Sequence, residues 1–61
     1  MATGDMLKNK RLEAGLSRKE LGDKVNVTES MIGQLERGTK TLTLPLAKEI
    51  AKVLGCSISD F

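Results

Sequence analysis

The sequence predicts an all-α domain of four to five short helices. Three observations predict this fold class. Apolar residues recur at helical spacing, capping residues precede and glycines follow these segments, and the alternating pattern of a β-strand is missing. Sixty-one residues allow one domain at most, so we expect residues 1–61 to form a single domain with a small core and modest stability.

The first helix is predicted from about Asp5 to Ala14, behind a disordered tail at residues 1–4, and Gly15 ends it. The second helix, from about Arg18 to Val25, follows a strong start signal. Ser17 and Glu20 have the spacing of a capping box, and leucines flank them at the positions of a hydrophobic staple.

The third helix is predicted from about Glu29 to Arg37, with Thr28 as its cap and Gly38 as its end. Asn26 precedes it, and Asn readily adopts the left-handed backbone conformation of a tight turn. Only the three residues "NVT" join the second and third helices, so the two must cross at a steep angle. A helix-turn-helix motif over residues 17–37 has this geometry.

The fourth helix begins after Thr43, its predicted cap, with Pro45 in its first turn. Gly55 ends it, and its apolar stripe consists of Ala47, Ile50, Ala51 and Leu54. Ser57 and Asp60 resemble another capping box, with Phe61 as the staple partner, which would begin a fifth helix.

The composition excludes several classes of protein. With one cysteine (Cys56) and no histidine, the chain cannot form an internal disulfide, and we expect neither a metal nor a cofactor. The near absence of aromatic residues argues against modules that stack single-stranded bases, and no catalytic motif indicates an enzyme. No membrane-spanning run or signal-peptide pattern is present, so we expect a cytoplasmic protein. The net charge of +2 permits nucleic acid as a partner without arguing for it.

The stretch "LSRKELGDKVNVTESMIGQLERG", from Leu16 to Gly38, resembles the helix-turn-helix of phage repressors and Cro. The flanking "KNKRLEAGLS" and "LAKEIAKVLGCS" are similar to the first and fourth helices of that family. The resemblance implies a lambda-repressor-like domain that binds double-stranded operator DNA, as a homodimer on a near-palindromic site. This chain departs from the family pattern at Gly22, Asn26 and Lys10, and none of these changes breaks the motif.

The resemblance also implies a role for each matching position. Arg18 would contact a phosphate or a nearby base. The residues expected to face the major groove are Thr28, Glu29, Ser30 and Gln34. Those expected near the DNA backbone are Arg37, Thr39, Lys40 and Lys10.

Among the groove residues, Gln34 is the best candidate base reader, because Gln pairs bidentately with adenine. Glu29 has two open interpretations: it accepts from a cytosine N4, or it only complements the positive end of the helix dipole. Gly33 either allows close approach to DNA or is a neutral surface change. Arg18 is a cation in a first helical turn, where the dipole disfavours it, and a phosphate partner would remove this misfit.

Arg11 is expected to point inward, because it lies on one helical line with Leu7 and Ala14. In the resembling family an Arg here pairs with a Glu at the position of Glu36. The resemblance therefore implies a buried, structural Arg11–Glu36 ion pair.

We therefore expect a sequence-specific, dimeric DNA-binding protein that regulates transcription as a repressor. Antitoxins and restriction–modification controllers use the same module, and a helical protein-interaction adaptor that has lost DNA binding is the alternative from another class. A further set of apolar residues belongs either to a dimer interface or to the core: Leu44, Leu46, Val53, Ile58 and Phe61.

Overall fold

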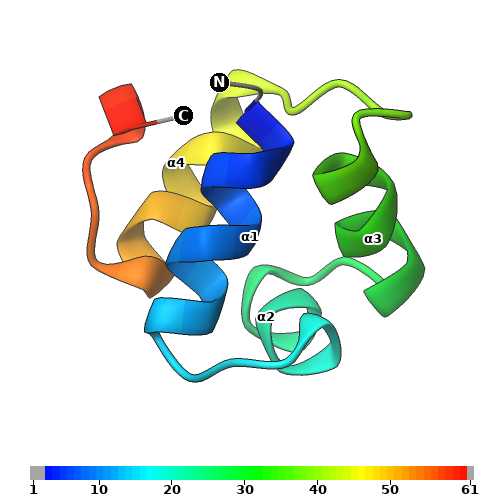
Figure 1. Cartoon of the computed structure of the whole chain (residues 1–61), viewed down its shortest axis with the longest axis horizontal. Coiled ribbons are helices and arrows are strands. Elements are labelled where there is room, and N and C mark those ends of the chain that lie inside the picture. Colours follow the sequence, from blue (N-terminus) through cyan, green and yellow to red (C-terminus); the bar gives the residue numbers. More distant parts are fainter. Residues whose placement is uncertain (1–2, 61) are drawn as a thin grey trace.

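The computed structural model describes residues 3–60, and the side chains of residues 4–59. Its elements are α1 (Thr3–Glu13), α2 (Arg18–Val25), α3 (Glu29–Arg37), α4 (Leu44–Leu54) and a 3-10 turn, η1 (Ile58–Asp60). This described part contains only helices and turns, as the sequence predicts. Helix α3 packs against α1 and α2, α2 also packs against α4, and η1 lies on α4. In Figure 1, α3 lies at one edge of the molecule and α4 near the other.

All four α-helices contribute to one apolar core. Its buried members are Leu7, Leu21, Val25, Ile32, Leu35 and Ile50. Half-buried residues surround them, including Leu16 and Val27, which flank the caps of α2 and α3. Within residues 3–60, no helix combines the length and the apolar character needed to cross a membrane.

Side-chain caps begin α2 and α3 at the predicted residues. Ser17 Oγ accepts from the Glu20 N–H at 3.0 Å, and the Glu20 carboxylate accepts from the Ser17 N–H at 2.8 Å, which completes the capping box. The hydrogen bond from the backbone of Ser17 holds the pKa of Glu20 below its usual value. Thr28 Oγ1 caps α3 by accepting from the Met31 N–H at 3.0 Å. Asn26 turns the chain between these helices in the left-handed conformation, with φ of 64°.

The expected disordered tail is wrong for Thr3 and Gly4, because α1 begins at Thr3. Gly4 is buried, and a Cβ on it would overlap the carbonyl oxygen of Glu36. The missing side chain thus lets the first turn of α1 approach the backbone at the end of α3. The other end of α1 also differs, because Ala14 lies beyond the helix and is exposed.

Two predictions near the C-terminus need correction. Thr43 has the backbone conformation of a cap, but its side chain makes no capping hydrogen bond, and Pro45 in the first turn removes one N–H that would need a partner. The fifth helix is only the 3-10 turn η1, in which Ser57 Oγ accepts from the Ser59 N–H at 3.3 Å. Phe61 lies outside the described residues.

Gly22 lies where α2 meets the turn before α3. A Cβ on Gly22 would stand 2.7 Å from the carbonyl oxygen of Val27 and 3.2 Å from the carbonyl carbon of Thr28. Both neighbours are backbone atoms, so they cannot move aside by changing a rotamer. The absence of a side chain at Gly22 therefore sets how closely the two helices of the motif approach.

We predict that Gly22→Ala lowers the free energy of unfolding by about 1–3 kcal/mol, because the added methyl group forces the backbone of the turn apart. The matched control is Gly33→Ala, where the added methyl meets only the flexible side chain of Arg37. The control should gain up to about 1 kcal/mol, because Ala favours a helix more than Gly does. Urea unfolding of both variants measures the difference, and a gain for Gly22→Ala would contradict the packing described here.

Candidate nucleic-acid interface

The carboxylate of Glu36, in α3, accepts hydrogen bonds from arginines on two other helices. Arg11, in α1, donates from Nε to Oε2 at 2.7 Å and from Nη2 to Oε1 at 3.4 Å. Arg18, in α2, donates from Nε to Oε1 at 3.1 Å. Arg11 Nη1 also donates to the carbonyl of Leu16 at 2.8 Å, in the loop between α1 and α2. We call Arg11, Arg18 and Glu36 the Glu36 cluster.

The Glu36 cluster contains the Arg11–Glu36 pair that the resemblance implied, with side chains 7% and 2% exposed. Burial raises the pKa of Glu36, but the hydrogen bonds from Arg11 and Arg18, together with their charges, outweigh burial and leave this pKa below its usual value. Glu36 is therefore a carboxylate at neutral pH. A buried carboxylate with two arginines fixes the geometry of three helices at one point.

Arg18 has an internal partner that the sequence does not reveal. Its Nε bonds to Glu36, yet 41% of its side chain remains exposed. Glu36 thus offsets the unfavourable position of this cation in the first turn of α2, so that misfit no longer argues for a phosphate. The hydrogen bond from Arg18 Nε to Glu36 instead fixes the direction in which the exposed part of the Arg18 guanidinium points.

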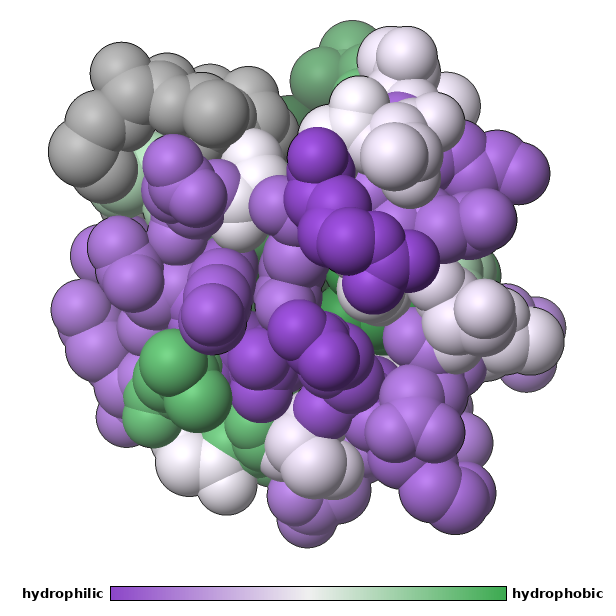
Figure 2. Space-filling view, turned by 45° about the vertical axis from the view of Figure 1, so that its right-hand side comes forward, coloured by the Kyte–Doolittle hydropathy of each residue, from purple (hydrophilic) through white to green (hydrophobic). Residues whose placement is uncertain are grey.

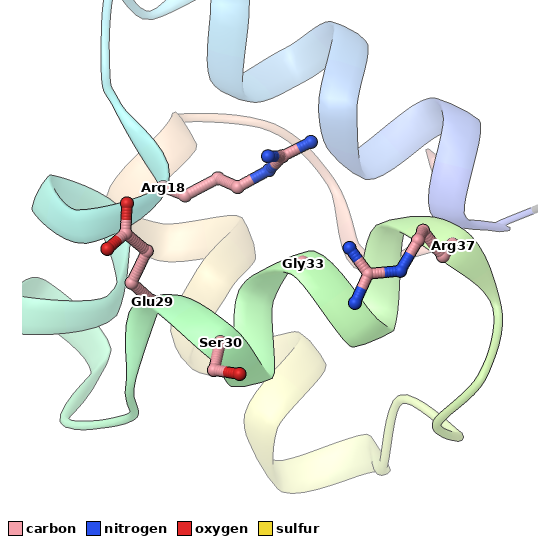
Figure 3. A pocket seen from close by; sticks show the side chains of 5 residues that line it. All are labelled: Arg18, Glu29, Ser30, Gly33 and Arg37. Carbon is pink, nitrogen blue, oxygen red and sulfur yellow. The ribbon is translucent and has the colours of Figure 1, made fainter.

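Five of the expected DNA-binding residues line one open hollow between α2 and α3, with a volume of about 290 Å³. They are Arg18, Glu29, Ser30, Gly33 and Arg37, and Figure 3 shows them together. The side chain of Arg37 does not extend towards the loop after α3. It lies back along the helix, and its Nη1 is 3.2 Å from where a Cβ on Gly33 would stand. We call this site the arginine hollow.

The other expected residues lie outside the arginine hollow. Gln34 is half-buried in the middle of α3, and Lys40 is exposed in the following loop. Thr28 is occupied as the cap of α3, and Thr39 Oγ1 donates to the carbonyl of Gln34 at 3.2 Å near the other end of that helix. Lys10, on α1, lies 3.9 Å from Glu13, with 29% of its side chain exposed. Thr28 and Thr39 thus stabilise the two ends of α3.

The view that brings the α3 side of the molecule forward shows a surface covered mainly by hydrophilic residues, with small separate apolar patches (Figure 2). Strongly hydrophilic side chains gather at its centre. Such a surface suits a polar, charged partner better than an apolar one.

The extra apolar residues near the C-terminus do not share one environment. Leu44 is 62% exposed, whereas Leu46, Val53 and Ile58 are half-buried, and Leu46 and Val53 pack against the core. Cys56 is also half-buried. The core therefore accounts for Leu46 and Val53, whereas Leu44 is largely exposed.

Comparison with known proteins identifies the motif. The helix-turn-helix family model matches residues 7–61, which is most of the chain. The chain belongs to the helix-turn-helix family of phage repressors and Cro. Members of this family are DNA-binding regulators of transcription.

Individual relatives agree with this assignment. Over 50 residues the chain is 40% identical to a protein of Methanothermobacter thermautotrophicus described as an uncharacterized HTH-type transcriptional regulator, which covers 82% of this chain and 72% of that protein. Two crystal structures of the clp gene regulator ClgR from Corynebacterium glutamicum superpose with TM-scores of 0.92 and 0.90, each at 30% identity over 97% of this chain. This chain spans 63% of the first ClgR chain and 77% of the second.

Sequence reasoning missed two contacts that shape this helix-turn-helix. One is the bond from Arg18 to Glu36, and the other is the close approach of Gly4 to the end of α3. Both join residues that are far apart in the chain, so no local spacing predicts them. The sequence offered no signal for the second contact, because Gly4 was expected to lie in the tail before the first helix.

We predict that Arg11→Met lowers the free energy of unfolding by about 3–5 kcal/mol, because it leaves Glu36 buried with a single half-exposed partner. Arg18→Met is the matched control, since it removes a donor from the same carboxylate on the exposed side. It should cost about 1 kcal/mol or less. Thermal and urea unfolding measure both, and equal effects of the two substitutions would contradict the buried pairing.

Glu36 should also make stability depend on acid. Its pKa is lower in the folded protein than in the unfolded chain, so the folded state binds this proton less tightly. The contribution of Glu36 to the free energy of unfolding should therefore be fully present above about pH 4.3, the ordinary pKa of Glu. This contribution should be lost as the pH falls through the pKa of Glu36 in the folded protein.

The measurement is the carboxyl ¹³C shift of Glu36 against pH, combined with urea unfolding at each pH. The shift should titrate below about pH 4.3, and Glu20→Gln should leave the titration unchanged. A midpoint above that value would show that burial outweighs the arginines.

Proposed function

We propose that the protein recognises specific sequences in double-stranded DNA by placing α3 in the major groove, and that it represses transcription from those sites. One observation carries this proposal: the Glu36 cluster holds α3 and Arg18 so that polar side chains and two guanidinium groups surround a single hollow on an exposed face. An α-helix fits the major groove, and donors and acceptors on its exposed side can reach base edges there.

Within this proposal Gln34 reads adenine, because its amide can donate to N7 and accept from the N6 amino group. Ser30 hydrogen-bonds to a base or phosphate beside it. Thr28 retains its role as the cap of α3. The partial positive charge at this end of the helix favours a nearby phosphate of the DNA backbone. Glu29 lies in the arginine hollow, and a cytosine N4 amino group is the base partner that suits its carboxylate.

Cations around α3 contact phosphates. Arg18 borders the hollow on the α2 side, Lys40 follows α3 in the next loop, and Lys10 lies on α1. Each neutralised phosphate adds about −0.9 to the slope of log K against log salt concentration. These residues orient the protein on the duplex without reading its sequence.

We further propose that the protein binds as a homodimer to a near-palindromic operator. Two copies related by a twofold axis would place their α3 helices in successive major grooves, about 34 Å apart along the duplex. Leu44, 62% exposed at the start of α4, supports an apolar contact between the two copies. The same module would serve an antitoxin or a controller protein that represses its own operon.

We predict that the protein elutes late in a salt gradient from a column of duplex DNA, whereas an adaptor that has lost DNA binding would pass through.

With a duplex selected from a random pool, Gln34→Ala should lose about 1–3 kcal/mol of discrimination at one base pair. Lys40→Ala should weaken binding to all duplexes similarly and reduce the salt slope by about 1. Fluorescence anisotropy measures both, and passage through the column without retention would refute the proposal.

A further inference from the structure

The guanidinium of Arg37 lies against Gly33, where the missing side chain leaves space for it. Arg37 belongs to the last turn of α3, and its guanidinium folds back towards the middle of the helix. Three of its atoms, Nη1, Nη2 and Cζ, lie 3.2–3.8 Å from the point where a Cβ on Gly33 would stand. A side chain at position 33 would therefore compete with the guanidinium for this space.

Arg37 is also free to bind a ligand. Within the described residues it has neither a hydrogen bond nor an ion pair, whereas Arg18 and Arg11 are both bonded to Glu36. Arg37 lines the arginine hollow, so its unpaired donors are available there. Glu29 and Ser30, from the first turn of α3, line the same hollow, and the Arg37 guanidinium lies beside Gly33 in the middle of the helix.

We infer that Arg37 reads a guanine base, rather than contacting the DNA backbone as its position at the end of α3 would suggest. This inference rests on the proposed function, in which α3 lies in the major groove. There the exposed side of the helix meets base edges, and phosphates lie at the borders of the groove, where the proposed function places Arg18 and Lys40. Guanine is the base that offers two neighbouring acceptors, O6 and N7, to a planar pair of N–H donors.

The guanidinium, rather than positive charge alone, is required for this contact. Lysine at position 37 would keep the attraction to phosphates but would lose the fork that binds two acceptors together. A base contact and a phosphate contact therefore respond differently to the same substitution, which makes the inference testable.

The first experiment selects duplexes from a random pool with the wild-type protein and with Arg37→Ala, Arg37→Lys and, as a matched control, Lys40→Ala. The wild-type sites should share a guanine that both Arg37 variants no longer select, while Lys40→Ala retains it. Affinity for this guanine over other bases should fall by about 5- to 140-fold in both Arg37 variants. Their melting temperatures should match the wild type, because Arg37 has no partner in the described fold.

The second experiment changes the base and leaves every phosphate in place. Replacing that guanine by 7-deazaguanine removes N7, and should weaken wild-type binding but have no further effect on Arg37→Ala. Hypoxanthine keeps O6 and N7 and lacks only the minor-groove amino group, so it should bind nearly as guanine does.

Selected sites without a shared guanine, equal weakening of all duplexes by Arg37→Ala, or full binding of the 7-deazaguanine duplex would each overturn the inference while leaving the proposed function standing. Recovery of no duplex at all by the wild-type protein would overturn both.

Discussion

The carboxylate of Glu36, shared by Arg11 and Arg18, is the interaction on which the rest of this structure depends. It joins α3 to α1 and α2 beneath the exposed face of the motif. Burying these charges is costly, and the cost is limited because every buried side-chain nitrogen and oxygen atom in the described residues has a partner. In so small a core, the directional hydrogen bonds of Glu36 add to the apolar contacts in fixing the relative positions of the helices.

At three glycines, the absence of a side chain allows close contacts that the same fold requires. Gly4 lets α1 reach the end of α3, and Gly22 lets α2 reach the turn before it. Gly33 is buried too, but it borders the arginine hollow, where it leaves space for the guanidinium of Arg37. The Glu36 cluster and the first two glycines thus determine where α3 stands, and Gly33 helps determine which donors it exposes.

Local signals made part of this structure predictable from the sequence. The bounds of α2 and α3 follow from Ser17, Glu20, Thr28 and Gly38, because caps and stops depend on residues within one turn. The resemblance supplied the Arg11–Glu36 pair and the list of candidate DNA contacts. The start of α1, the second partner of Glu36 and the folded-back side chain of Arg37 depend on contacts across the fold or on rotamers, so spacing along the chain did not reveal them.

The most direct test of the role of Glu36 is the rate at which the Nε–H protons of the three arginines exchange with water, measured by NMR. We expect the Arg11 proton to exchange most slowly, because it is buried and bonded to Glu36 at 2.7 Å. The Arg18 proton should be intermediate, and that of Arg37, which has no partner in residues 3–60, should be fastest. Equal, fast exchange at all three would show that Glu36 does not hold the helices together.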